Sequence, residues 1–519
     1  MAGGIWVQSH CYRGDEMLRL LKVAEDYGFR IATLQHVLEG YRVAPEMYAH
    51  GVGGSTFSDW WSYKKEAFDA IPYNAAMMMK AGIVTSLNSD SADLIRHLNF
   101  EAGKTMRFGG LAAEEAMKLI PITPAIQLGL EGRIGSIEVG KDGDFAVFNG
   151  HPLDTHSRNV LTLIEGEIFF QYPGFELDGS TPGPGNGFVP EPPRDVLPVP
   201  DGNSVYAIVG ATIHPVTSEV IENGTLIIQN GRIQSILENN SRPVGATIVD
   251  ATGLHVYPGL INAATQMGLS EISGLAQTVD SRDLSTYQPE LRTLSAINPH
   301  SEHIAVSLVE GITLAHAVPL GGIISGRGSV VQMSGWTMPE MLRSGETGLV
   351  INLPILPSKF APNLDKKKYD ERVEEDLTSM AKTEAYIRNA RHYAKLKAAG
   401  KNPTTHFRYE AMIPYVTGEK PVFFRAQTYK GILQALNFAE AFDLKAVILG
   451  GGEAWKLANR LAEDSVPVII TSVFRLPFPA YGGGDSYERF NSFYENAGKL
   501  EEAGVLFAIA SSGTERAKQ

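Results

Sequence analysis

Three side chains that can bind a metal ion or move a proton each follow a predicted strand near the start of the chain. His10 ends the run GGIWVQSH, His36 ends RIATLQH and Asp90 ends GIVTSLNSD. The carboxyl ends of parallel strands meet on one face of a barrel, where barrel enzymes carry their active sites. Two imidazoles and a carboxylate suit Zn²⁺ or a similar divalent ion, with a water molecule completing the shell. The pattern therefore predicts a site for a divalent metal ion.

Each of these residues also has a structural interpretation. A single histidine after an apolar strand is more often a hydrogen-bonded structural residue than a ligand. Asp90 could instead cap the helix predicted to follow it. Because three such residues occur at three strand ends, the metal site is favoured over the structural interpretations for the three residues taken together. Nearby aromatic residues, Tyr12, Trp60 and Trp61, are candidate substrate-binding residues, with simple packing as the alternative.

The elements that must position these side chains alternate between strand and helix. The amphipathic run EMLRLLKVAEDYG, residues 16–28, lies between the strands that end at His10 and His36. Such alternation predicts parallel βα units. Short strands with glycine turns replace it in 133–172 and again in 204–257, with hairpin signals at Asn223-Gly224 and Asn230-Gly231. The βα alternation then returns from residue 258.

A stretch rich in proline and glycine, 173–203, separates these regions and predicts a linker. The regions on its two sides contain an internal repeat. Aligning Ala24-Glu25 with Ala439-Glu440, and Ala81-Gly82 with Ala503-Gly504, matches the order of elements at the two ends of the chain. In this alignment His10 corresponds to Arg425 or Ala426, His36 to Gly451 and Asp90 to Ser512. The second copy is therefore predicted to lack these metal ligands.

Composition narrows the classes of partner. The 519 residues carry a formal net charge of −13 and no long basic cluster, which argues against nucleic acid or an anionic membrane surface. The single cysteine, Cys11, excludes an intramolecular disulfide and a cysteine-based zinc site. No signal peptide or membrane-spanning run is visible. We expect a cytoplasmic location by default, with a periplasmic or secreted one left open, and a homo-oligomer is possible.

Several longer strings resemble the metal-dependent amidohydrolase superfamily, in its imidazolonepropionase-like branch. They are LQHVLEGYRVAPEMYAHGVGGSTFSDWWSYK, IPYNAAMMMKAGIVTSLNSDSADL and RIGSIEVGKDGDFAVFNGHPLDT. The resemblance implies a distorted (β/α)8 barrel and a β-sandwich built from both chain ends. It also implies that His10 and His36 are metal ligands and that Asp90 both touches metal and shuttles the proton. The implied metal is zinc, with iron or manganese as alternatives, and the implied substrate is a small cyclic amide or N-acyl compound.

The family's remaining ligands form a His-x-His motif on the first barrel strand. The corresponding string here is PGLINAATQMG, residues 258–268, where Ala264 and Gln266 stand at the histidine positions. An alanine methyl group cannot bind a metal, and a glutamine amide is a poor zinc ligand. We therefore expect weak or absent metal retention by this chain, and a catalytically inactive binding or structural protein is the alternative function.

The resulting prediction is an α/β protein with parts of two related barrels. It assigns 1–132 to strands five to eight of the first barrel, 133–172 to sandwich strands of that copy, 173–203 to the linker, 204–257 to sandwich strands of the second copy and 258–519 to a degenerate second barrel. The two sandwich segments are expected to pair in one composite sandwich. A central fragment of a longer tandem amidohydrolase explains this order most simply, and a natural permutation is the alternative.

Overall fold

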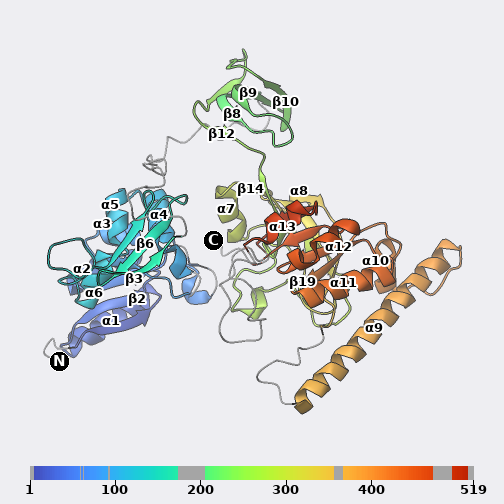
Figure 1. Cartoon of the computed structure of the whole chain (residues 1–519), viewed down its shortest axis with the longest axis horizontal. Helices are drawn as coiled ribbons and strands as arrows, with labels where there is room; N and C mark the ends of the chain where they lie inside the picture. The colour runs from blue at the N-terminus through green and yellow to red at the C-terminus, as the bar shows by residue number, and fades with distance from the viewer. Residues whose placement is uncertain are drawn as a thin grey trace. The chain divides into compact units, whose positions relative to one another are not determined.

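The structure is a computed structural model that describes residues 5–58, 60–61, 64–91, 94–172, 205–355, 366–471, 494–511 and 513. Helices and strands alternate through most of it, which confirms the α/β class (Figure 1). The chain divides into two compact units. One comprises Met1–Pro190, Asn262–Glu310 and Leu314–Gln519, and the other comprises Glu191–Ile261 and Gly311–Thr313. The predicted linker lies outside the described residues.

The first part of the chain forms a four-stranded parallel sheet in the order β1-β2-β3-β4. Its elements are β1 (Val7–Cys11), α1 (Gly14–Asp26), β2 (Ile31–His36), α2 (Ala44–His50), β3 (Gly53–Thr56), α3 (Asn74–Lys80) and β4 (Thr85–Leu87). Apolar residues of α1 recur at helical spacing, so Met17, Leu21 and Ala24 are buried against Leu34 of β2. This packing holds the strand ends that carry the histidines.

Helices and a small antiparallel sheet follow. They are α4 (Leu98–Gly109), α5 (Ala113–Lys118), α6 (Ile122–Leu128), β5 (Phe145–Phe148), β6 (Asn159–Ile164) and β7 (Glu167–Gln171). The second unit contains another sheet, in the order β10-β9-β8-β11, with β12 also paired to β8. Its strands are β8 (Tyr206–Ile213), β9 (Ile221–Gln229), β10 (Arg232–Leu237), β11 (Thr247–Asp250) and β12 (His255–Val256). The two predicted sandwich segments thus form separate hydrogen-bonded sheets, and their packing into one sandwich stays a prediction.

One of the two predicted hairpin turns is wrong. Asn230-Gly231 does connect β9 to β10, with φ of 51° and 69°. Asn223-Gly224 instead lies inside β9, where the pairing with β8 shifts register between Ala211 and its neighbours. Asn223 has a φ of 51°. The same dipeptide therefore forms an irregularity within a strand, because a bulge uses the left-handed backbone that a turn also needs.

The last region of the chain, from β13 to β22, contains two further sheets. Their strand orders are β13-β14-β16-β17 and β15-β18-β19-β20-β21-β22. Its strands are β13 (Leu260–Thr265), β14 (Ile312–Ala317), β15 (Ile324–Arg327), β16 (Ser329–Gln332), β17 (Leu342–Ser344), β18 (Leu349–Ile351), β19 (Val422–Ala426), β20 (Ala446–Gly450), β21 (Val468–Ile470) and β22 (Phe507–Ile509). Its helices are α7 (Glu302–Val309), α8 (Met338–Met341), α9 (Lys366–Ala398), α10 (Phe407–Val416), α11 (Tyr429–Ala441), α12 (Ala458–Glu463) and α13 (Asn496–Glu502).

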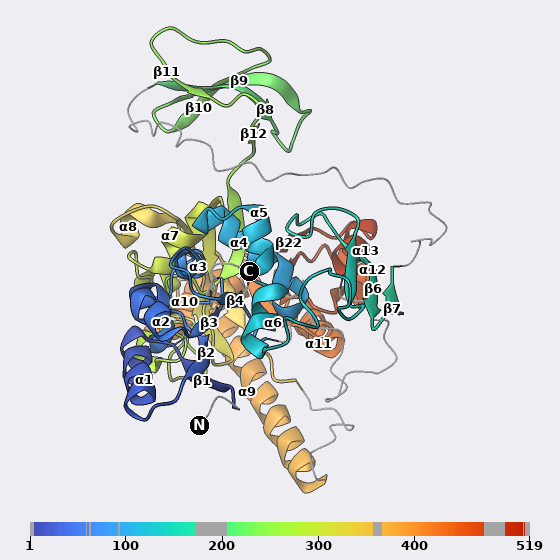
Figure 2. The same cartoon turned by 90° about the vertical axis from the view of Figure 1, so that its left-hand side faces the viewer.

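The strands of this region do not form one closed sheet within the described ranges. The first strand nevertheless meets the residues that follow the last one. The backbone N–H of Gln266 donates to the carbonyl of Gly513 at 2.9 Å, and the Asn262 amide donates to the Ser511 hydroxyl at 2.8 Å. A closed (β/α)8 barrel stays a prediction for this region. Helix α9 is a single helix of 33 residues (Figure 2), and no helix in the described parts is long and apolar enough to cross a membrane.

Strands β1 to β4 and strands β19 to β22 share one arrangement. Both sets are parallel and paired in chain order. Helices α1 and α11, which follow the first strand of each set, both have 13 residues, and α3 and α13 both have seven. The same topology therefore occurs twice, while its origin as a tandem copy stays a prediction.

Two side-chain contacts also recur at matching places. The Asn74 amide donates to the carbonyl of Val37 at 2.7 Å and accepts from the Tyr41 N–H at 2.9 Å. Asn496 does the same with Gly451 and Trp455, at 2.9 Å each. Each asparagine thus ties the loop after the second strand of its set to the helix that precedes the fourth.

A glutamate in each of these loops caps the preceding long helix. Glu39 accepts from the Gly14 N–H of α1 at 2.9 Å, and Glu453 accepts from the Tyr429 N–H of α11 at 2.5 Å. A carboxylate at a helix N-terminus satisfies a backbone donor and interacts favourably with the helix dipole. The two sets of strands are therefore framed by equivalent asparagine and glutamate contacts.

Candidate active site

His10, His36 and Asp90 come together at the carboxyl ends of β1, β2 and β4. The Nδ1 atom of His10 lies 2.5 Å from Nε2 of His36, which is a short hydrogen bond between the two rings. On the opposite side of the same ring, Nδ1 of His36 lies 3.9 Å from Oδ2 of Asp90. The three residues are separated by up to 80 positions in the sequence, and parallel pairing of the strands brings them into one row.

Two of these residues have unusual backbone conformations. His36 has a φ of 72° and Asp90 a φ of 40°. Residues other than glycine rarely adopt positive φ, and such positions are concentrated at functional sites because the surrounding structure must hold them there. In His36 this conformation occurs at the last residue of β2.

The environment of His36 favours its neutral form. Its side chain is buried, and burial lowers the pKa of the imidazole, with smaller contributions from His10 and Lys64 that also lower it and from Asp90 that raises it. The buried Nδ1 atom has no hydrogen-bond partner within the described residues. A neutral imidazole with a free nitrogen can accept a proton or bind a cation.

Aromatic rings pack against His36. Tyr12 stacks on it at a centroid distance of 4.7 Å and an interplanar angle of 8°, and Phe57 stacks on it at 5.4 Å and 30°. Trp60 extends the stack beyond Phe57 at 4.5 Å, and the Lys64 ammonium lies 3.4 Å from the centroid of Tyr12. Of the three predicted aromatic residues, Tyr12 and Trp60 therefore belong to the stack that holds His36.

Trp61 is buried, with 6% of its surface exposed, and its indole N–H has no hydrogen-bond partner within the described residues. The sequence analysis missed Phe57 and Lys64. Phe57 directly follows β3, the strand between β2 and β4, so its position at a strand end was the signal that could have found it.

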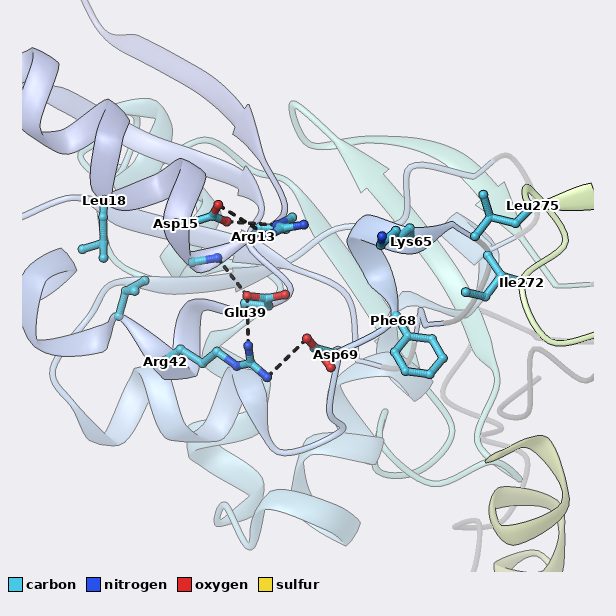
Figure 3. A pocket seen from close by; sticks show the side chains of 12 residues that line it. Arg13, Asp15, Leu18, Glu39, Arg42, Lys65, Phe68, Asp69, Ile272 and Leu275 are labelled. Atoms are coloured by element: carbon cyan, nitrogen blue, oxygen red, sulfur yellow. Dashed lines mark hydrogen bonds and ion pairs between the residues drawn. The ribbon is translucent and has the colours of Figure 1, made fainter. Parts of the chain in front are cut away.

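A pocket of about 630 Å³ opens next to the residues that follow β1 and β2 (Figure 3). Paired charges occupy much of its wall. Arg13 forms an ion pair with Asp15 at 2.9 Å, and Arg42 contacts Glu39 at 3.6 Å and Asp69 at 3.3 Å. Lys65 and Phe68 also line the pocket. A small polar molecule would meet both signs of charge there.

The three predicted ligands do not fit a complete metal site. The described residues contain no group of three His, Cys, Asp or Glu side chains that could hold a metal ion. The reason is the orientation of His36, since His10 faces one ring nitrogen and Asp90 faces the other. The three side chains therefore form a row and do not converge on one point.

The corresponding positions of the last region carry no such row. Ala264 is fully buried in a cluster of apolar side chains, and Gln266 follows β13. In the ladder, Ala426 pairs with Gly450 as Cys11 pairs with His36, so Gly450 occupies the position of His36, one residue before the predicted Gly451. The sequence alignment was wrong by one residue because β2 contains a register shift that β20 lacks. Ser512, predicted to match Asp90, lies outside the described residues.

Comparison with known proteins agrees with the arrangement of these elements. Residues 73–179 match the model of the amidohydrolase family. The chain carries an amidohydrolase domain. The matched part of this amidohydrolase domain includes α3, β4, Asp90 and the antiparallel sheet of β5, β6 and β7, whereas His10 and His36 precede it.

Two proteins similar to this chain extend the comparison. The amidohydrolase tasK of Hapsidospora irregularis is 22% identical over 531 residues, which cover 93% of this chain and 53% of the relative. The chain thus spans about half the length of that curated relative. The solved structure of an amidohydrolase from Thermotoga maritima is 25% identical, with a TM-score of 0.50, and the match covers 59% of this chain and 78% of that one.

Proposed function

We propose that the protein hydrolyses carbon–nitrogen bonds other than peptide bonds, with His10, His36 and Asp90 at its centre. The observation that carries the proposal is the row of these three side chains at successive strand ends, with 2.5 Å between His10 and His36 and 3.9 Å between His36 and Asp90. The amidohydrolase domain and the relatives that share it support the reaction class.

In this proposal Asp90 transfers the proton of the reaction. A water oxygen attacks the carbonyl carbon, Asp90 takes a proton from that water, and the same proton passes to the leaving nitrogen as the carbon–nitrogen bond breaks. The row of contacts places the neutral His36 ring between Asp90 and His10. In this position His36 can orient the carboxylate of Asp90. The rings of Tyr12 and Phe57, which stack on His36, hold its imidazole in place.

Metal dependence, with zinc, iron or manganese, forms a separate part of the proposal. His10 and His36 offer two nitrogen atoms, while Asp90 lies on the far side of His36. We propose that these residues alone retain a divalent ion weakly, because a zinc site usually needs three protein ligands around one point.

The proposed substrate is a small cyclic amide, such as an imidazolone-like ring, or a small N-acyl compound. The pocket beside Arg13 and Arg42 supports this size class, because about 630 Å³ holds a small molecule and its charged wall can orient a polar one. We propose neither nucleic acid nor a membrane surface as a partner. A homo-oligomer is included in the proposal.

The test is release of an amine from a panel of cyclic amides and N-acyl amino acids, measured with an amine-reactive fluorophore. Activity should fall about 100-fold or more in Asp90→Asn, as expected for loss of a general acid–base group. His10→Ala should show a similar loss. His156→Ala provides the matched control, because this histidine is exposed and paired only with Asp154 in the described structure. Full activity in Asp90→Asn would contradict the proposal.

A second function, a non-catalytic binding or structural protein, is favoured by one observation. The described residues hold no group of three ligands for a metal ion. If the panel gives no turnover with or without added zinc or manganese, while the substrates still bind, this second function is the one supported.

A further inference from the structure

A half-buried arginine occupies the position in the last region that matches His10 in the first. Cys11 pairs with His36 in one ladder and Ala426 pairs with Gly450 in the other, so Arg425 on β19 corresponds to His10 on β1. The offset between the repeated helices gives the same match. A position that carries an imidazole ring in one set of strands therefore carries a guanidinium group in the other.

Arg425 lies on the same face of β19 as Phe423, because alternate residues of a strand point to the same side. Phe423 belongs to an apolar cluster with Ala264, Val350, Leu449 and Ile469. Arg425 is thus one step closer to the carboxyl ends of the strands than Phe423, and it pairs with Leu449 of the same cluster. Gln266 follows Ala264 by the same two-residue step at the end of β13.

The guanidinium group of Arg425 is poorly satisfied by the described residues. Its Nη2 atom donates to the carbonyl of Pro319 at 3.2 Å, while the buried Nε atom has no hydrogen-bond partner there. No described carboxylate lies within ion-pair distance of it, in contrast to Arg327 with Glu346 or Arg408 with Glu290. Burial alone lowers the pKa of Arg425 to about 10, so the group remains charged at neutral pH.

A half-buried cation with a buried, unpaired N–H group and no acidic partner is destabilising unless an anion accompanies it. A guanidinium group has a planar fork that matches the two oxygens of a carboxylate. The apolar cluster beside Arg425 suits a carboxylate attached to an apolar body. We propose that the carboxyl-end face of the β19–β22 strands binds a small organic carboxylate through Arg425.

This inference is independent of the proposed hydrolase function, because it concerns other strands and another side chain. The inference gives the last region a ligand-binding role. The lack of metal ligands by itself would suggest only a structural role for this region. The amide of Gln427, which donates to the Thr471 hydroxyl at 2.8 Å and accepts from the Gly452 N–H at 3.1 Å, fixes the loop beside Arg425.

The experiment measures benzoate binding to the full chain by isothermal titration calorimetry, with benzamide as the uncharged isostere and chloride at matched ionic strength as the control. Benzoate should bind, and benzamide and chloride should not. Arg425→Gln should weaken benzoate binding about tenfold or more, as expected when one partner of a charge-assisted contact is removed. Arg343→Ala, which removes an exposed arginine of the same region, should bind benzoate as the wild type does.

Two further measurements make the result decisive. His10→Ala should leave benzoate binding unchanged, and a loss there would assign the ligand to the first site and overturn the inference. If Arg425→Gln is too unstable to titrate, Arg425→Lys keeps the charge without the fork and should bind benzoate weakly. An unchanged affinity in Arg425→Lys or Arg425→Gln, or an equal response to benzamide, would also overturn it.

Discussion

At the scale of single residues, His36 combines features that rarely occur together. It is buried, its backbone is left-handed, two aromatic rings stack on it, and His10 and Asp90 face different nitrogens of its ring. Each feature favours one ring orientation and one protonation state. A site that depends on a neutral imidazole is thereby prepared before any substrate arrives.

The lowered pKa of His36 predicts a pH dependence of stability. In the unfolded chain the imidazole regains its ordinary pKa of about 6.5, so below that pH the unfolded state binds a proton that the folded state resists. The free energy of unfolding should therefore be constant above this pH and fall on acidification until the folded pKa is passed. Burial lowers the pKa of His316 as well, so both residues contribute.

Urea unfolding between pH 8 and 5, a range chosen around the histidine pKa of about 6.5, measures this effect. His36→Phe keeps a ring in the stack but cannot be protonated, so its stability should fall less steeply on acidification than that of the wild type. His156→Ala, at an exposed histidine, should keep the wild-type slope. A wild-type slope in His36→Phe would show that His36 is not held neutral.

Metal content is also predicted at this scale. Because Asp90 faces the opposite nitrogen of His36 from His10, we expect purified protein to contain clearly less than one zinc per chain after dialysis against a weak chelator. Plasma mass spectrometry measures it. One tightly held metal per chain that disappears in His10→Ala would show that the side chains rearrange into a complete site.

At the scale of elements, the recurring asparagine contacts hold a loop to a helix in both sets of strands. Asn74 and Asn496 are buried, with 1% and 2% of their surface exposed, and each both donates and accepts. Removing such a side chain leaves a backbone donor and a carbonyl without partners, which is more costly than losing an exposed hydrogen bond.

Asn74→Ala and Asn496→Ala should each lower the free energy of unfolding by about 2 kcal/mol. Chemical denaturation followed by circular dichroism measures this loss. Asn437→Ala removes an exposed asparagine on α11 and should change stability little. Equal effects of all three substitutions would contradict the role assigned to the buried amides.

The sequence was informative about elements where one pattern had one structural meaning. The amphipathic run of α1 and the strand ends at His10 and His36 appear where the pattern predicted them. Asn223-Gly224 failed because a turn and a bulge need the same backbone conformation. The row formed by His10, His36 and Asp90 could be expected, but the ring orientation that keeps Asp90 from His10 depends on packing by Tyr12 and Phe57.

At the scale of the whole molecule, separate apolar cores support the two sets of strands. Leu34 of β2 belongs to a cluster with Met17 and Met47, while Ile448 of β20 belongs to a cluster with Phe424 and Leu436. A chain with several cores often unfolds in more than one step. Although the two sets of strands share one topology, we therefore do not expect them to unfold in a single transition.

Leu34→Ala and Ile448→Ala should each cost about 2–5 kcal/mol, because both side chains are fully buried. Differential scanning calorimetry should show that each substitution shifts a different transition to lower temperature. Leu18→Ala, at a partly exposed position of α1, is the milder comparison. A single transition shifted equally by both core substitutions would show that the two cores unfold together.

The hydrogen bonds of Asn496 and Glu453 have a consequence for protein engineering. Asn496 bonds the backbone of the loop and Glu453 accepts from the backbone of α11, so neither contact involves the side chains at the strand ends. The last region can therefore serve as a host for transplanted chemistry. A histidine at Arg425 would stand where His10 stands, whereas one at Gly450 would need the backbone to move, because φ is 126° there and an added Cβ would lie 2.7 Å from the carbonyl oxygen of Ala426.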